Sequence, residues 1–175
     1  MKRNEWIWFL FCILLGTGCA TISAPSGTVP SRKGLATDPY GGWLTATIND
    51  TPAQVQGEFI ALNKDSVFVL SGDSLKIIPV SKFNTARIIL FNTEANKYSI
   101  WTVVLSVATI ANGAFATITF PVSLAMGLTT VHDEARREHF FDFPQRPWSE
   151  LSKYARFPQG LPEELDRGKL KGKPK

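Results

Sequence analysis

The sequence predicts an α+β protein with a small five-stranded β-barrel or bent antiparallel sheet, followed by an apolar helical hairpin and a short C-terminal helix. Two observations carry this prediction. Five short stretches of alternating residues recur about every ten positions between 43 and 91, as in small all-β domains. Residues 98–131 then run for 34 positions without a charged side chain, which exceeds the roughly 20 residues of a membrane-spanning helix.

The N-terminal residues 1–18 have the layout of a secretory signal. Lys2 and Arg3 precede an apolar stretch at 6–15, and small residues then lead to Cys19. Ten apolar residues suit a signal segment and are few for a stable membrane span. The alternatives are an ordinary cleaved signal and an uncleaved N-terminal anchor.

The stretch Leu-Gly-Thr-Gly-Cys at 15–19 resembles the signal of bacterial lipoproteins, with Gly16 where that family usually has Leu. The resemblance implies cleavage before Cys19 and acylation of its thiol, palmitate being a typical chain, so that membrane lipid is a partner of the mature protein. Two or three long acyl chains anchor a protein stably. Ala20, rather than Asp, implies the outer membrane with the protein facing the periplasm; the inner membrane stays open.

The charge of the 175-residue chain is unevenly distributed. The net charge is +4, yet residues 19–166 hold 12 basic and 14 acidic side chains. Such a body does not favour nucleic acid as a partner. Residues 19–40, rich in small residues and Pro, are predicted to be a flexible tether. The basic residues 167–175 are predicted to be a disordered tail, either a solubilising end or a contact for anionic lipid headgroups.

The small β domain is predicted over residues 41–93. Its expected strands are 43–48, 55–62, 66–70, 75–80 and 86–91. Gly57 permits the sharp bend that closing so small a sheet requires. The pattern Val55-x-Gly57-x-Phe59, followed by Ile77-Ile78-Pro79-Val80, resembles an Sm-like small barrel. Some Sm-like proteins bind RNA, which the charge of this body does not favour.

The apolar segment at 94–137 is predicted to form two helices, 96–111 and 117–137, since Asn112-Gly113 interrupts the run. Three interpretations compete. Membrane insertion or association, as a transmembrane helix or a hairpin, is the favoured one. The others are a helical pair packed on the β domain and an oligomerisation surface, such as the buried interface of a homo-oligomer or of an accessory subunit in an envelope transport or assembly complex.

The only cluster of titratable residues surrounds His132 and His139. The two histidines are seven residues apart, which places them on one face of a continuous helix but does not give metal-ligand spacing. No phosphate-binding Gly-rich loop or nucleophile elbow is present in the sequence. We therefore predict no catalytic residue, metal or cofactor, and no enzyme; a metal-dependent enzyme using these histidines is the remaining alternative.

The C-terminal region 138–166 is predicted to hold a short strand near 140–143 that adds to the sheet and a short helix within 147–155. Its candidate docking residues are Trp148, Tyr154, Arg156 and Phe157. The favoured alternative is that these side chains pack back on the domain. The sequence as a whole predicts a lipid-anchored bacterial envelope protein with a structural or binding role.

Overall fold

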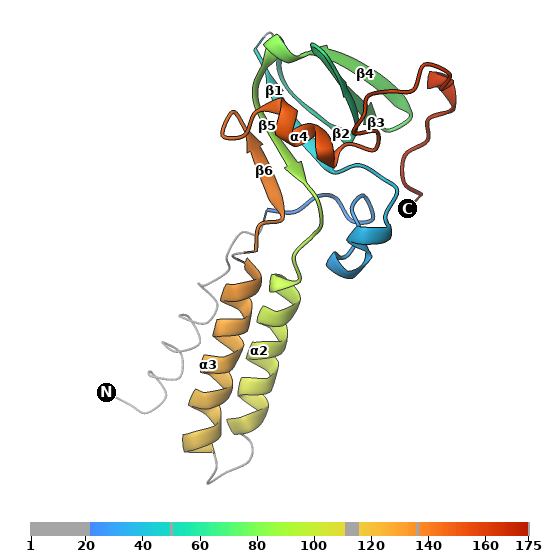
Figure 1. Ribbon diagram of the computed structural model, residues 1–175. Coiled ribbons are helices and arrows are strands. Elements are labelled where there is room, and N and C mark those ends of the chain that lie inside the picture. Colours follow the sequence, from blue (N-terminus) through green and yellow to red (C-terminus); the bar gives the residue numbers. More distant parts are fainter. Residues whose placement is uncertain (1–21, 50, 111–115, 136, 175) are drawn as a thin grey trace. The chain divides into compact units, whose positions relative to one another are not determined.

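The computed structural model describes residues 22–49, 51–110, 116–135 and 137–174 (Figure 1). Within them the chain divides into two compact units. The hairpin unit is residues 93–137, and the sheet unit is residues 23–92 with 138–174. Cys19 lies outside the described residues.

The sheet unit is built on one open antiparallel sheet of six strands in the order β4-β3-β2-β1-β5-β6. The strands are β1 (Trp43–Ile48), β2 (Thr51–Asn63), β3 (Ser66–Ser71), β4 (Ser74–Pro79), β5 (Phe83–Ile89) and β6 (Phe140–Phe143). This confirms the α+β prediction and the antiparallel sheet. Barrel closure is not shown for the described residues. The sixth strand comes from beyond the helical hairpin and pairs with β5.

Strand β2 carries the irregularities that let the sheet curve. The β2–β3 register shifts between Phe59 and Ala61, and the β1–β2 register shifts near Ala46. Such bulges bend a strand and increase its twist. At Gly57, an added Cβ would lie 2.3 Å from the carbonyl oxygen of Leu70. Only glycine fits this crossing of β2 and β3, so Gly57 has a steric role in the curved sheet.

The main core lies between the sheet and the C-terminal helical turns, α4 (Trp148–Leu151) and η4 (Ser152–Tyr154). The strands supply the inward residues of the alternating pattern, and Leu44, Phe59, Val67, Val69, Ile88 and Leu151 are fully buried. Trp148 meets the rings of Phe59 and Phe83 edge-on, with centroids 6.1 and 5.0 Å away. These contacts tie the C-terminal region to the sheet.

The C-terminal tail is packed on the sheet unit, which differs from the predicted disorder of 167–175. After η5 (Arg167–Lys169), Leu170 is buried in a second core cluster with Phe68 and Leu70. Lys173 forms an ion pair with Asp38. A composition of Gly, Pro and Lys is typical of a disordered tail, so the sequence did not predict this packing. The segment is held by one buried leucine and one ion pair, which composition does not reveal.

The N-terminal segment also contacts the sheet unit, although residues 19–40 were expected to be a flexible tether. Its described part contains η1 (Arg32–Thr37), and Ala24 and Val29 are buried. The amide of Ala24 donates to Asn92 Oδ1 at 2.8 Å, and Asn92 Nδ2 donates to the Ala24 carbonyl at 3.1 Å. This reciprocal pair fixes the segment at the end of the strand region.

The hairpin unit consists of α2 (Ala95–Ile110) and α3 (Ala116–Ala135), which run antiparallel and in contact (Figure 1). Both helices agree with the predicted ones within two residues. Among the described residues, no helix combines the length and the apolarity needed to cross a membrane. The transmembrane helix that was one form of the favoured interpretation is therefore not found there.

Candidate functional site: the apolar hairpin

Large apolar side chains are exposed on the outward faces of α2 and α3. We call these faces the apolar shaft; its residues are Ile100, Trp101, Val103, Val104 and Leu105 on α2 and Val122, Met126 and Leu128 on α3, which are 37–67% exposed. In the described sheet unit the only comparable residues are Leu35 and Ile77. Apolar patches of this extent mark contact surfaces for membranes or other proteins.

The contact between the two helices is made by small and hydroxyl-bearing residues. Thr102 of α2 is buried against Gly127 of α3, where an added Cβ would lie 2.2 Å from Thr102 Cγ2. The helix axes therefore approach closely because position 127 has no side chain. The hairpin thus has a polar residue at the contact between its helices and apolar residues on its outward faces. This is the reverse of the usual amphipathic helix in water.

The described threonine hydroxyls of the hairpin are hydrogen-bonded within their own helices. Thr102 Oγ1 donates to the Tyr98 carbonyl at 2.8 Å. Thr129 and Thr130 both donate to the Met126 carbonyl, at 2.8 and 2.9 Å. A hydroxyl satisfied in this way needs no water, so these residues are compatible with an apolar environment.

Charged residues of the hairpin unit gather at one end, which we call its base. Glu94 and Lys97 lie at the start of α2, 3.9 Å apart, and Glu134 pairs with Arg137 at 2.6 Å beyond the end of α3. Because the two helices are antiparallel, the start of α2 and the end of α3 lie at the same end of the hairpin, and both belong to the base. The Tyr98 hydroxyl donates to Glu94 Oε2 at 3.3 Å, and this carboxylate raises the pKa of Tyr98.

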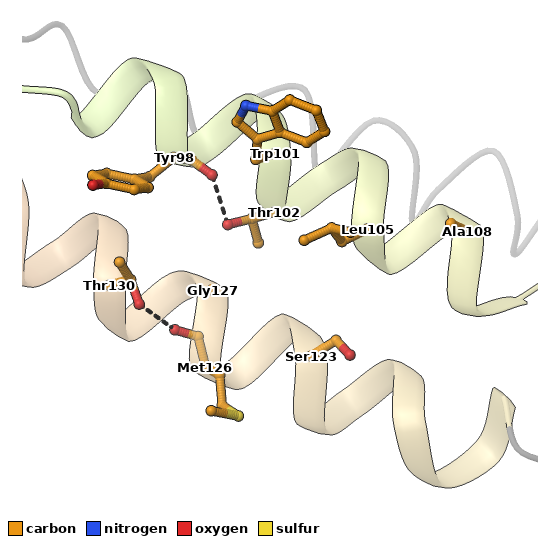
Figure 2. Close-up of a pocket in the computed structure, with 9 residues that line it drawn as sticks. All are labelled: Tyr98, Trp101, Thr102, Leu105, Ala108, Ser123, Met126, Gly127 and Thr130. Atoms are coloured by element: carbon orange, nitrogen blue, oxygen red, sulfur yellow. Dashed lines mark hydrogen bonds between the residues drawn. The ribbon is translucent and has the colours of Figure 1, made fainter.

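A groove of about 460 Å³ runs between the two helices. Figure 2 shows Thr102 directed toward the turn of α3 that holds Gly127, and Met126 pointing away from α2. The other residues around it are Tyr98, Trp101, Leu105, Ala108, Ser123 and Thr130. Tyr98 is its only titratable residue, so the groove offers a binding surface for apolar groups and no acid–base pair.

The predicted docking aromatics pack largely on the domain. Trp148 is only 6% exposed and lies in the main core. Tyr154 is stacked on Phe141 with the ring centroids 4.7 Å apart. Phe157 packs against the second core cluster, and its amide donates to the Ile60 carbonyl at 2.8 Å. Most of their ring surface is therefore used inside the sheet unit.

Arg156 forms a buried ion pair rather than an open cationic anchor. Its Nε lies 2.7 Å from Glu58 Oε1, and its Nη2 lies 2.5 Å from Glu58 Oε2. The Gly41 amide also donates to Glu58 Oε1, at 2.8 Å. Sequence reasoning missed Glu58; the signal was an acid directly before the apolar run Phe59–Leu62, since a buried acid needs a partner.

A second bidentate pair joins the last two strands of the sheet. Arg87 on β5 donates to both carboxylate oxygens of Asp142 on β6, each at 2.7 Å. The hydrogen bond to Asp142 raises the pKa of Arg87, against a smaller effect of burial. The pair reinforces the register of the strand that arrives from beyond the hairpin.

The two histidines have different surroundings. His132 is exposed near the end of α3, whereas His139 is buried beside Phe91 and Phe140, with ring centroids 6.1 and 4.9 Å away. They belong to different units. Within the described ranges, no three His, Cys, Asp or Glu residues gather as metal ligands.

No protein-family model, curated protein or solved structure matches this chain. The candidate function therefore depends on the sequence and the geometry described above.

Proposed function

We propose that this protein is a lipid-anchored bacterial envelope protein that holds its sheet unit at a membrane surface, in a structural or binding role. Acylated Cys19 is the first attachment, and contact of the apolar shaft with lipid is the second. The observation that carries the proposal is the reversed hairpin, apolar outside and hydroxyl-bearing inside. Lipid tails are the surroundings in which that arrangement is stable.

The connections of the sheet unit support attachment to one membrane. Ala24 is hydrogen-bonded to Asn92, and the Leu90 amide donates to the His139 carbonyl at 2.8 Å. Cys19 precedes Ala24 by five residues, which at full extension span about 18 Å. Helix α2 begins three residues after Asn92, and His139 follows α3 by four. The anchor segment and both connections to the hairpin thus leave the sheet unit from one cluster of hydrogen bonds.

The apolar shaft adds binding energy to the acyl anchor. Transfer of one large aliphatic side chain from water contributes about 1.5–3 kcal/mol when burial is complete. Ile100 and Met126 are the most exposed of these residues. Several such side chains together exceed the marginal attachment that one acyl chain provides. The protein should therefore stay with membranes at high salt.

Labelling with radioactive palmitate tests the anchor. We expect label on the full chain and on Cys12→Ser, which serves as the matched control because Cys12 lies in the leader. Cys19→Ser should carry none, and the mature chain should begin at residue 19 by mass. Absence of label from the unsubstituted chain would overturn the anchor.

A second candidate is an accessory subunit of an envelope transport or assembly complex, or a homo-oligomer, that buries residues 98–131 against protein. Trp101 and Met126 line the groove between the helices, and aromatic residues and methionine are enriched in protein interfaces. This lining favours the protein-interface candidate. A photo-crosslinker placed at Ile100 in cells separates the candidates. Lipid adducts support membrane contact, and a discrete protein adduct supports the interface.

For the sheet itself, we propose the Sm-like small barrel as the arrangement of β1–β5. Its support is the steric need for Gly57 and the two register shifts on β2. Strand β6 pairs with β5 only from Ala86 onward, so an experimental structure in which β4 pairs with residues 83–85 of β5 would establish closure. A solvated β4 edge would exclude it. We do not propose RNA as a partner.

A further inference from the structure

The sheet unit holds a pocket of about 410 Å³ beside the point where the chain leaves for the hairpin. Pro30, Leu35, Tyr40 and Leu90 supply apolar and aromatic walls. Lys153 supplies a cation, whereas the lining residues Asp38 and Arg156 are held in ion pairs. Leu90 is also the residue whose amide is bonded to the His139 carbonyl. The pocket therefore adjoins the hydrogen-bonded cluster from which the anchor segment and the hairpin connections depart.

The tail brings more positive charge to this pocket. The Lys171 carbonyl accepts a hydrogen bond from Arg156 Nη2 at 3.1 Å, and Lys173 Nζ lies 5.6 Å from the centre of the Tyr40 ring. Figure 1 shows the C-terminal end beside the η1 segment of the sheet unit. That segment carries two further exposed cations, Arg32 and Lys33.

The acids near the pocket are already neutralised. Glu58 is paired with Arg156, and Asp38 is paired with Lys173. Lys153 lines the pocket, and Arg32 and Lys33 lie on η1, which also carries the lining residue Leu35. These three cations and Lys171 form no ion pair among the described residues. The slightly acidic body thus has a local basic rim, which attracts anions.

We propose that this pocket binds the phosphate headgroup of an anionic phospholipid in the anchoring membrane. The inference rests on the proposed function, because the anchor segment and both hairpin connections join the sheet unit at residues close to the pocket. Lys153 and the η1 cations contact the phosphate, while Pro30 and Leu35 contact the glycerol and the first methylenes. Each such cation contributes about a fivefold gain in affinity.

Amide shifts of labelled glycines test the site directly. The full chain is purified in neutral detergent with ¹⁵N-glycine and titrated with short-chain phosphatidylglycerol or phosphatidylcholine. Gly41 and Gly42 line the pocket, whereas Gly72 lies in the β3–β4 turn and serves as the internal control. We expect saturable shifts at Gly41 and Gly42 with phosphatidylglycerol only. Equal shifts with both lipids, or none, overturn the proposal.

Charge variants show whether the rim does the binding. Lys153→Gln and Arg32→Gln should each weaken phosphatidylglycerol binding about fivefold without moving the unfolding midpoint. Lys76→Gln, on exposed β4, is the matched control and should bind as the unsubstituted chain does. Equal binding by all three variants would contradict the assignment to this pocket.

Inorganic phosphate distinguishes the source of the anion. Binding as tight as that of phosphatidylglycerol would mean that the pocket takes a free phosphate, and would overturn a lipid headgroup. The titration does not depend on the acyl group of Cys19. Failure of palmitate labelling with intact glycine shifts would therefore reject the lipid anchor and leave the headgroup site standing, and the reverse result would reject only the site.

Discussion

The sheet unit and the hairpin unit place similar apolar residues in opposite positions. In the sheet unit most large aliphatic and aromatic residues of the strands are buried, as Leu44 and Phe59 illustrate. In the hairpin unit Ile100 and Met126 are about two-thirds exposed, while Thr102 is buried. The sheet unit is thus a domain with its own core, and the hairpin is an element whose apolar surface requires other surroundings.

The two units also differ in how the hydrogen bonds and charges of their polar side chains are satisfied. The sheet unit pairs the acids that it buries, through a bidentate contact between Glu58 and Arg156 and through Lys173 at Asp38. The hairpin has no charge along its shaft and bonds its described threonine hydroxyls to its own backbone. Substitutions in the two units should therefore change different properties, namely the stability of the fold and membrane attachment.

The largest expected effect is on the buried ion pair of the sheet unit. Glu58→Gln leaves the Arg156 guanidinium buried without a charged partner and should lower the free energy of unfolding by about 3–5 kcal/mol. Denaturant unfolding followed by tryptophan fluorescence measures it. Glu150→Gln, at an exposed position, is the control and should change it by less than about 0.5 kcal/mol. If Glu58→Gln lowered the free energy of unfolding as little as the control does, the Glu58–Arg156 pair would not be a main stabilising contact of the fold.

The next effect compares an exposed isoleucine in each unit. Ile100→Asp on the shaft should weaken flotation of the Cys19→Ser chain with phosphatidylcholine vesicles, by about 3 kcal/mol of transfer free energy. Ile77→Asp on β4 should leave flotation unchanged, although Ile77 is 50% exposed and Ile100 is 65% exposed. Equal losses for the two variants would show that general surface apolarity, rather than the hairpin, binds lipid.

A smaller effect is expected within the hairpin. Gly127→Val forces α2 and α3 apart at Thr102 and should destabilise their packing by about 1–3 kcal/mol. Hydrogen exchange of the α2 amides should accelerate while the unfolding midpoint of the sheet unit stays constant. Ala125→Val, at an exposed position of α3, is the matched control. A shift of the sheet midpoint by Gly127→Val would contradict the independence of the two units.

The smallest effect is electrostatic and lies at the base of the hairpin. Because the Glu94 carboxylate disfavours the tyrosinate, Glu94→Gln should lower the pKa of Tyr98 toward its ordinary value of about 10. Absorbance titration of the tyrosines in detergent measures the change. Glu150→Gln in the sheet unit should leave the titration curve as it is. An unchanged curve for Glu94→Gln would mean that the Tyr98–Glu94 hydrogen bond is absent in solution.

Local patterns predicted most elements correctly. Alternation at 43–48 and 66–70 corresponds to β1 and β3, and the charge-free run corresponds to α2 and α3 with the break near Asn112. The choice of buried and exposed faces in the hairpin could not be predicted, because a helix that is apolar on all sides shows no preferred face. The candidate docking residues make their described contacts inside the sheet unit, and the partner Glu58 was not predicted from the sequence.

By itself, the sequence determined the alternating strands and the apolar hairpin with its charged base, because each depends on residues close together in the chain. It also predicts the lipoprotein-like signal that ends at Cys19. Only the tertiary structure decided the partners of distant residues. Glu58 and Arg156 pair across 98 positions, and β6 joins β5 from beyond the hairpin. Burial makes such pairs necessary, but the closure of long loops decides which residues meet.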